Sequence, residues 1–253
     1  MEHLVAKVGL VGLVMLGATW AARRWGDGVG GWIAGLPLTS GPMSLFLAVE
    51  QGPAFAARAA QSTMLALNGV AAFCVVYAAL CGRSWIAAVT GGVCAFAVVC
   101  WALAGVVSTV GATLAITLPV LAFASRALRT VPAPIAREEG PGSDLPCRVV
   151  AAILLTMGVT QMAATLGPEV SGSISPLPIV AGVLATSALL RQGAEAARRV
   201  LRGVVVGSFG FVAFFVVVAV VLPRAGLPAS YLSAVVAALV IQAAVPLATL
   251  GRA

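Results

Sequence analysis

Charged side chains are scarce in this 253-residue chain, where they make up 9% of the residues against 61% hydrophobic ones. A soluble fold of this composition would have too little polar surface to cover itself. The mean hydropathy of +1.08 agrees with this, and the sequence shows no water-soluble domain. The composition therefore predicts an integral membrane protein, in which any chemistry takes place in or beside the membrane.

Residue types that carry catalysis or bind metals are also nearly absent. The single histidine is His3, and the five cysteines form no Cys-x-x-Cys pair, so we expect no metal site and no cofactor. The segment from Gly26 to Gly31 fits the pattern G-x-G-x-x-G, but it follows an apolar run instead of a β-strand and does not indicate a dinucleotide site. The chain also lacks an ATP-binding motif. We therefore do not expect an enzyme.

Long apolar runs fill most of the sequence. They are about 20 residues long, which is the length that a helix needs to cross about 30 Å of hydrocarbon. They lack the alternation of membrane β-strands. We predict an all-α polytopic membrane protein of nine transmembrane helices. The expected spans are residues 4–22, 29–49, 62–82, 85–105, 107–127, 147–166, 172–190, 203–222 and 229–249.

The chain contains an internal repeat. Residues 7–103 align without a gap on residues 148–244, at a constant offset of 141. Matched groups include Leu36-Pro37 with Leu177-Pro178, Gln51-Gly52 with Gln192-Gly193, Gly69 with Gly210, and Phe73 with Phe214. Internal repeats of membrane modules are typical of transporters. Because a fifth helix separates the two four-helix copies, we expect the second copy to be inverted relative to the first.

This interpretation divides the chain into four parts. Residues 1–105 form the first four-helix repeat and residues 106–128 the linker helix. Residues 129–146, which are rich in proline, glycine and charge, form a flexible cytoplasmic loop. Residues 147–253 form the second four-helix repeat.

The basic residues give the expected orientation. The nine-helix topology puts twelve of the fifteen Lys and Arg residues on the cytoplasmic side and leaves Lys7, Arg58 and Arg224 outside. This predicts a multi-pass protein of the bacterial inner membrane, with its N-terminus outside, its C-terminus in the cytoplasm and its first helix retained. An eight-helix topology without the linker helix also gives a biased count, so span length favours nine. The net charge of +7 is dispersed over short loops and does not indicate a nucleic-acid partner.

The second and seventh predicted spans each carry two prolines with flanking glycines. Proline breaks or kinks a helix, and the freed backbone groups must then face a cavity or another helix. Matched interruptions in two repeats point to a substrate site, although the prolines could instead only kink packed helices. The predicted substrate-binding residues are Pro37, Thr39, Ser40, Ser44, Asn68, Ser173, Ser175, Pro178 and Ser187.

Residues that follow the broken spans form a second candidate set, with one group at each membrane face. The predicted gate or coupling residues are Glu50, Gln51, Arg58, Gln192 and Arg199. The two arginines would draw anions toward a pathway, and Glu50 would accept a proton or a cation. Alternatively, they anchor the helix ends among lipid head groups.

The first copy resembles a known family. Residues 30–38 read Gly-Gly-Trp-Ile-Ala-Gly-Leu-Pro-Leu, and a span leads from there to Glu50-Gln51-Gly52 and then to Ala57-Arg58. This pattern is similar to that of the GlpM-like small membrane proteins, bacterial proteins of about one four-helix unit that are associated in name with alginate production. This chain departs from them by carrying two units and a linker helix, and the resemblance brings no functional residues with it.

Two hypotheses follow for the function. The first is a secondary transporter or exporter of a small polar or amphipathic solute, which works by rocking one repeat against the other. Its partners would be membrane lipids and a small-molecule substrate, with a homodimer as a possible assembly. The second is a non-transport accessory subunit that supports envelope polysaccharide or lipid assembly. The transporter predicts that polar residues of both copies converge on one cavity, whereas the accessory subunit predicts that the Gly/Pro segments are packed solid.

Overall fold

The computed structural model describes residues 36–104, 109–128, 150, 154 and 165–250, and all regular structure in them is helical, as expected. The helices are α3 (Ser40–Glu50), α4 (Pro53–Leu80), α5 (Trp85–Leu103), α6 (Val110–Ala127), α8 (Ile179–Gln192) and α9 (Ala194–Leu250). Residues 165–174 form a further helical segment before α8. The predicted span 4–22, and nearly all of 147–166, lie outside the described residues.

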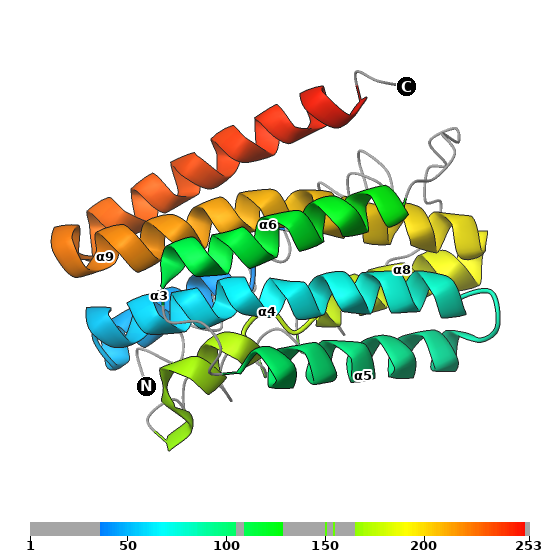
Figure 1. The fold of residues 1–253 in the computed structure, drawn as a ribbon, viewed down its shortest axis with the longest axis horizontal. Helices are drawn as coiled ribbons and strands as arrows, with labels where there is room; N and C mark the ends of the chain where they lie inside the picture. Colours follow the sequence, from blue (N-terminus) through cyan, green and yellow to red (C-terminus); the bar gives the residue numbers. More distant parts are fainter. Residues whose placement is uncertain (1–35, 105–108, 129–149, 151–153, 155–164, 251–253) are drawn as a thin grey trace.

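Five helical stretches of this part of the chain are long and apolar enough to cross a membrane. They are Pro53–Leu80, Trp85–Leu103, Val110–Ala127, Thr165–Gln192 and Ala194–Ala244. The predicted spans 203–222 and 229–249 both fall within α9. There the chain turns back at Gly226, whose φ of 73° and ψ of 176° depart from the helix (Figure 1). The helical, apolar architecture is that of a membrane protein.

The two long helices start earlier than the apolar runs indicate. α4 begins at Pro53 instead of residue 62, and α9 begins at Ala194 instead of residue 203. The residues just before them, Gly52 and Gly193, both have a φ of 90° with an extended ψ, which is essentially a glycine conformation. These glycines end the preceding short helices and turn the chain into the long ones.

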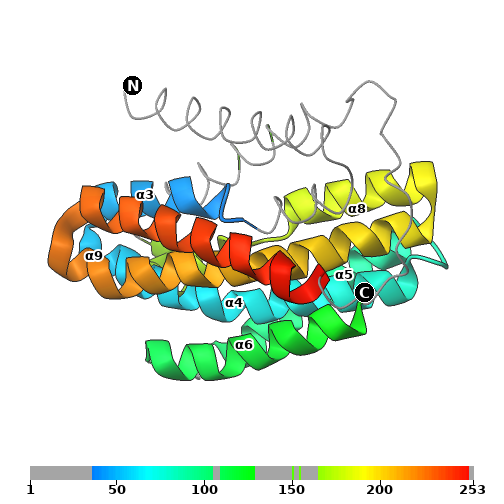
Figure 2. The ribbon, with the colours of Figure 1, turned by 90° about the horizontal axis from the view of Figure 1, so that it is seen from above.

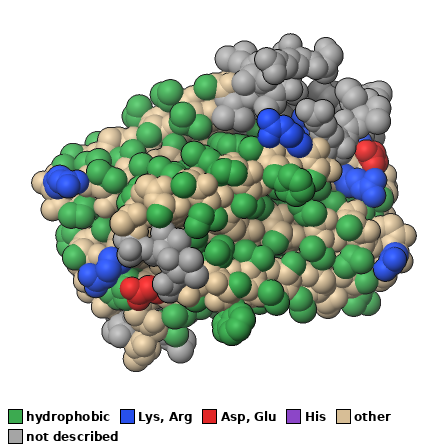
Figure 3. Space-filling view, in the orientation of Figure 1, with side chains coloured by type: hydrophobic (Ala, Val, Ile, Leu, Met, Phe, Trp, Pro, Cys, Tyr) green, Lys and Arg blue, Asp and Glu red, His purple; other side chains and the backbone are tan. Residues whose placement is uncertain are grey.

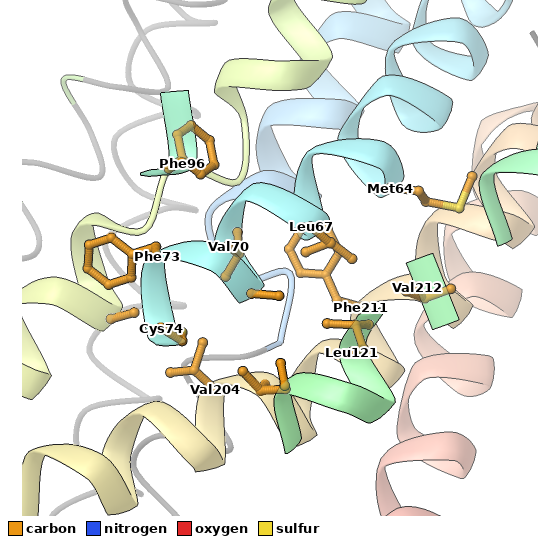
Figure 4. Close-up of a cluster of buried hydrophobic side chains, with 14 of the residues drawn as sticks. Met64, Leu67, Val70, Phe73, Cys74, Phe96, Leu121, Val204, Phe211 and Val212 are labelled. Carbon is orange, nitrogen blue, oxygen red and sulfur yellow. The ribbon is translucent and has the colours of Figure 1, made fainter. Parts of the chain in front are cut away.

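α4 and the first part of α9 form the centre of the bundle. In each of these helices 67% of the most apolar window is buried, against 17% in α5 and 22% in α6. They run antiparallel, because Arg198 near the start of α9 donates from Nε to the carbonyl oxygen of Ala78 near the end of α4. The core contains Leu67 and Val70 of α4 together with Val204 and Phe211 of α9 (Figure 4).

Two glycines allow each central helix to pack closely on the helix that follows it. A Cβ added at Gly69 of α4 would lie 2.8 Å from Sγ of Cys100 and 3.0 Å from the carbonyl oxygen of Phe96, both in α5. A Cβ added at Gly210 would collide with the amide of Gln242 in the last part of α9. Small residues are the usual means of close helix packing in membranes.

The outer helices present large apolar side chains on the surface. Trp101 of α5 is 81% exposed, and Phe123 of α6 and Leu232 of α9 are each 70% exposed. Most of the charged side chains in view lie toward the two ends of the bundle, and hydrophobic side chains cover the zone between them (Figure 3). This distribution suits a lipid surround, where an exposed aromatic residue has no cost of hydration.

Candidate functional site

The short helices α3 and α8 lie end to end along one side of the central pair (Figure 2). Their N-terminal ends face each other near the middle of the bundle, and their C-terminal ends point toward opposite ends of it. α3 has 11 residues and α8 has 14, so neither could cross a membrane alone. Both are therefore half-helices that start deep inside the molecule.

The same local structure starts both half-helices. The Leu38 N–H donates to the Leu36 carbonyl at 2.7 Å, and the Ile179 N–H donates to the Leu177 carbonyl at 2.7 Å. Each bond closes a tight turn around a proline that has no N–H of its own. The next carbonyls then serve the helices, since the Pro37 carbonyl accepts from Gly41 at 2.7 Å and the Pro178 carbonyl from Gly182 at 2.8 Å.

A small cavity of about 50 Å³ lies where the two half-helices meet. The two breaks and the middle sections of α4 and α9 line it. The lining residues are Leu36, Leu38, Thr39, Ser40, Leu67, Val70, Pro176, Leu177, Pro178, Val180, Ala181, Val204, Ser208 and Phe211. None of these residues is charged. The cavity is midway along the long helices, because Leu67 and Val70 are close to the centre of Pro53–Leu80.

Three hydroxyl groups line the cavity. Ser40 is 1% exposed, and its Oγ donates to the Ser175 carbonyl at 2.8 Å. Ser208 is also 1% exposed, and its Oγ donates to the Val204 carbonyl at 2.8 Å. The oxygens of both serines can still accept a hydrogen bond. Thr39 is half-buried and makes no capping bond with its side chain, so its hydroxyl can turn to suit a ligand.

Backbone donors are also available there. The first amides of a helix have no acceptor within the helix. Among the described residues, the amides of Ser40, Val180 and Ala181 have no hydrogen-bond acceptor, whereas those of Gly41 and Gly182 are satisfied by the proline carbonyls. The free amides belong to residues that line the cavity. The site therefore offers hydrogen-bond donors from both half-helices.

Each half-helix packs against the long helix that follows the other one. Gly41 of α3 faces Phe214 of α9, where an added Cβ would lie 3.5 Å from the ring. Gly182 of α8 faces Phe73 of α4, where the corresponding distance is 3.4 Å. Both members of the second contact stand 141 positions after their counterparts. Such reciprocal contacts are the pattern of a two-fold interface.

Two tyrosine hydrogen bonds join the same pairs of helices. The Ser44 and Tyr231 hydroxyls are 2.9 Å apart and connect α3 to the last part of α9. The Tyr77 and Thr186 hydroxyls are 2.8 Å apart and connect α4 to α8. The half-helices are thus fixed at their sides, while their N-terminal ends border open space.

The predicted substrate residues divide into three groups. Thr39, Ser40 and Pro178 line the cavity. Pro37 and Ser175 are buried beside it, between residues that line it. Ser44 lies further along α3 and is engaged with Tyr231.

Three predicted residues lie elsewhere, which corrects the sequence interpretation. Asn68 is buried against α6, where its Nδ2 donates to the Leu65 carbonyl and to Oγ1 of Thr117, because one helical step turns it away from Leu67. Ser173 lies before the break and donates to the Glu169 carbonyl. Ser187 is half-buried on α8 and is not among the residues that line the cavity.

The sequence prediction missed Ser208 and its apolar neighbours in the cavity wall. Ser208 lies within an almost wholly apolar run, and nothing in the run distinguishes it from a serine that packs against another helix. Its one signal was position, since Leu67 of the cavity wall precedes it by 141 residues.

The predicted gate residues lie at the two ends of the bundle. Glu50 and Arg58 are exposed near the junction of α3 and α4, with Gln51 between them. Gln192 and Arg199 are half-buried near the junction of α8 and α9, at the opposite end (Figure 1). None of them lies at the cavity. In the described part of the chain, His, Cys, Asp and Glu form no cluster that could hold a metal ion.

No family model, curated protein or solved structure matches this chain. The structure by itself defines an α-helical protein with membrane-spanning helices and an uncharged cavity between two opposed half-helices.

Proposed function

We propose that this protein is a secondary transporter or exporter, and that its solute passes through the cavity between α3 and α8. The carrying observation is that both helix breaks face one cavity at the middle of the long helices. Transporters place their substrate sites near the bilayer midplane, between discontinuous helices. An accessory subunit with solidly packed Gly/Pro segments would have no use for this cavity.

The proposal includes an inverted duplication. Its support is the set of features that recur at an offset of 141 residues: the glycine conformations at 52 and 193, the tight turns at Leu36–Leu38 and Leu177–Ile179, and the reciprocal glycine–phenylalanine contacts. The opposite directions of α4 and α9 also support it. On this proposal the chain crosses the inner membrane nine times, with its N-terminus outside and its C-terminus in the cytoplasm.

The connections suggest how the halves would move. Gly52 and Gly193 join each half-helix to the long helix after it, and no atom lies within 4 Å of a Cβ added at either position. A glycine in open space can change its dihedral angles without a clash. Rotation about these two residues would tilt a half-helix and open the cavity first to one side and then to the other. The energy would come from a gradient or from a partner.

Thiol labelling in intact cells tests the topology on which this rests. Single cysteines would replace Glu50, Arg58, Arg191 and Arg199 on a background without the five native cysteines. We expect a membrane-impermeant reagent to label the first two from outside only and the last two from inside only. Labelling of all four from one side would refute the inversion.

A second labelling experiment tests the pathway. Ser208→Cys places a thiol in the cavity wall, and Ala185→Cys places one at a fully buried position of α8 outside the wall. A carrier predicts that a small impermeant reagent reaches position 208 from both membrane faces and position 185 from neither. Protection of position 208 from both faces, in a folded variant, would favour the accessory subunit.

A further inference from the structure

We infer that the ligand of this cavity is a small monovalent inorganic anion of halide size. The inference rests on the proposed transport function and names its substrate class. It starts from the cavity itself, whose size, backbone donors and charge pattern each restrict what can bind there.

Size comes first. A water molecule takes up about 30 Å³ in the liquid, and pockets for organic ligands usually measure about 300–1,000 Å³. The cavity of about 50 Å³ is therefore far too small for a sugar, an amino acid or a nucleotide in this conformation. A halide-sized ion with one or two waters would fit it.

The backbone defines the sign of the charge. Each helix carries the equivalent of about half a positive charge at its N-terminal end. Two such ends face each other across the cavity, so together they resemble about one positive charge without any basic side chain. The free amides of Ser40, Val180 and Ala181 give this potential a direction, because they donate to an anion. Helix ends of this kind lose little strength where water is scarce.

The side chains agree with this reading. Among the described lining residues there is no carboxylate that would compete for the amides and no Lys or Arg that a polyvalent anion would need. The Thr39 hydroxyl is free to donate, which adds a neutral partner for an anion. A cation would meet two positive helix ends with no compensating charge, so cations are excluded.

A matched pair of substitutions at Thr39 tests the inference. Thr39 is the residue just before α3, and both Asp and Asn are favoured at that position, so neither variant should impair folding. The side chains have nearly the same shape and differ by one negative charge. Thr39→Asn should keep anion transport within about threefold of the unmodified protein, since a neutral amide can also donate. Thr39→Asp should lower it at least about tenfold, because the carboxylate would occupy the anion's position.

The assay uses the full chain in proteoliposomes, with chloride, iodide and nitrate as probes and glycerol as a neutral control. Chloride binding is measured separately from the broadening of its NMR line in detergent. We expect anion flux and chloride binding in the unmodified protein and in Thr39→Asn, and the loss of both in Thr39→Asp. Equal anion flux in the two variants would overturn the inference.

The remaining outcomes separate the two proposals. Passage of glycerol without passage of anions would overturn the anion inference and leave transport standing. Chloride binding that Thr39→Asp abolishes, without flux of any probe, would support the site and count against transport. Neither binding nor flux would overturn both.

Discussion

The two sides of the cavity share a backbone and differ in chemistry. One side is built by α3 and α9 and carries the hydroxyls of Thr39, Ser40 and Ser208. The other side is built by α8 and α4, where the positions 141 residues away from these three hold Val180, Ala181 and Leu67. The tight turns and helix starts are the same on both sides.

This difference separates two tasks. Features that depend on the backbone, namely the proline turns, the free amides and the glycine junctions, recur on both sides. Side-chain hydroxyls occur on one side only. A ligand that is held mainly by backbone amides would need the first set twice and the second set once, and this is the arrangement that the cavity shows.

The helix hairpins offer the sharpest test of this comparison. At Gly69 an alanine would press on the ring and the backbone carbonyl of Phe96, whereas at Gly210 it would press mainly on the side-chain end of Gln242, which can rotate. We expect Gly69→Ala to lower the free energy of unfolding by about 3 kcal/mol and Gly210→Ala by about 1 kcal/mol. Unfolding titrations in mixed micelles would measure both, and equal losses would show that the hairpins are packed alike.

The glycine junctions should respond equally. Alanine at Gly52 or Gly193 would meet no atom, so the whole effect comes from a φ of 90° that a side chain rarely adopts. We expect each substitution to cost about 2 kcal/mol. The same titrations apply, with Gly111→Ala as the control, since Gly111 lies on α6 in open space without a positive φ. A large effect at only one junction would break the proposed equivalence.

The smallest effects are expected at the two tyrosine bonds. Tyr231→Phe removes the bond to Ser44, and Tyr77→Phe removes the bond to Thr186. Hydrogen bonds between membrane helices contribute about 0.6 kcal/mol on average. Each variant should lose about that much stability in the same titration. Double variants with Ser44→Ala or Thr186→Ala should lose little more, and additive losses would contradict the pairing.

Much of the fold followed from patterns that depend on neighbouring residues alone. Apolar runs gave the spans of α5 and α6 almost to the residue, because burial in lipid demands an apolar run of fixed length. The starts of α4 and α9 were placed too late. Arg58 and Arg199 made those segments look like loops, although long cationic side chains extend from a helix end into the head-group region.

The site was only partly predictable for a related reason. Pro37 and Pro178 marked the breaks, since proline acts on its own backbone. Asn68 was misplaced because the rotation of a helix decides which neighbour it meets, and an apolar helix carries no polar face that would reveal that rotation. Ser208 was missed for the same reason.

The amino-acid sequence by itself determined that this is a helical membrane protein with two proline-broken spans, because composition, run length and proline chemistry act locally. Only the tertiary structure decided that the breaks face each other, that their free amides line one small uncharged cavity, and that the hydroxyls lie on one side of it. Those facts depend on how helices far apart in the chain pack together. Side-chain fit across helices fixes that packing, and local patterns do not encode it.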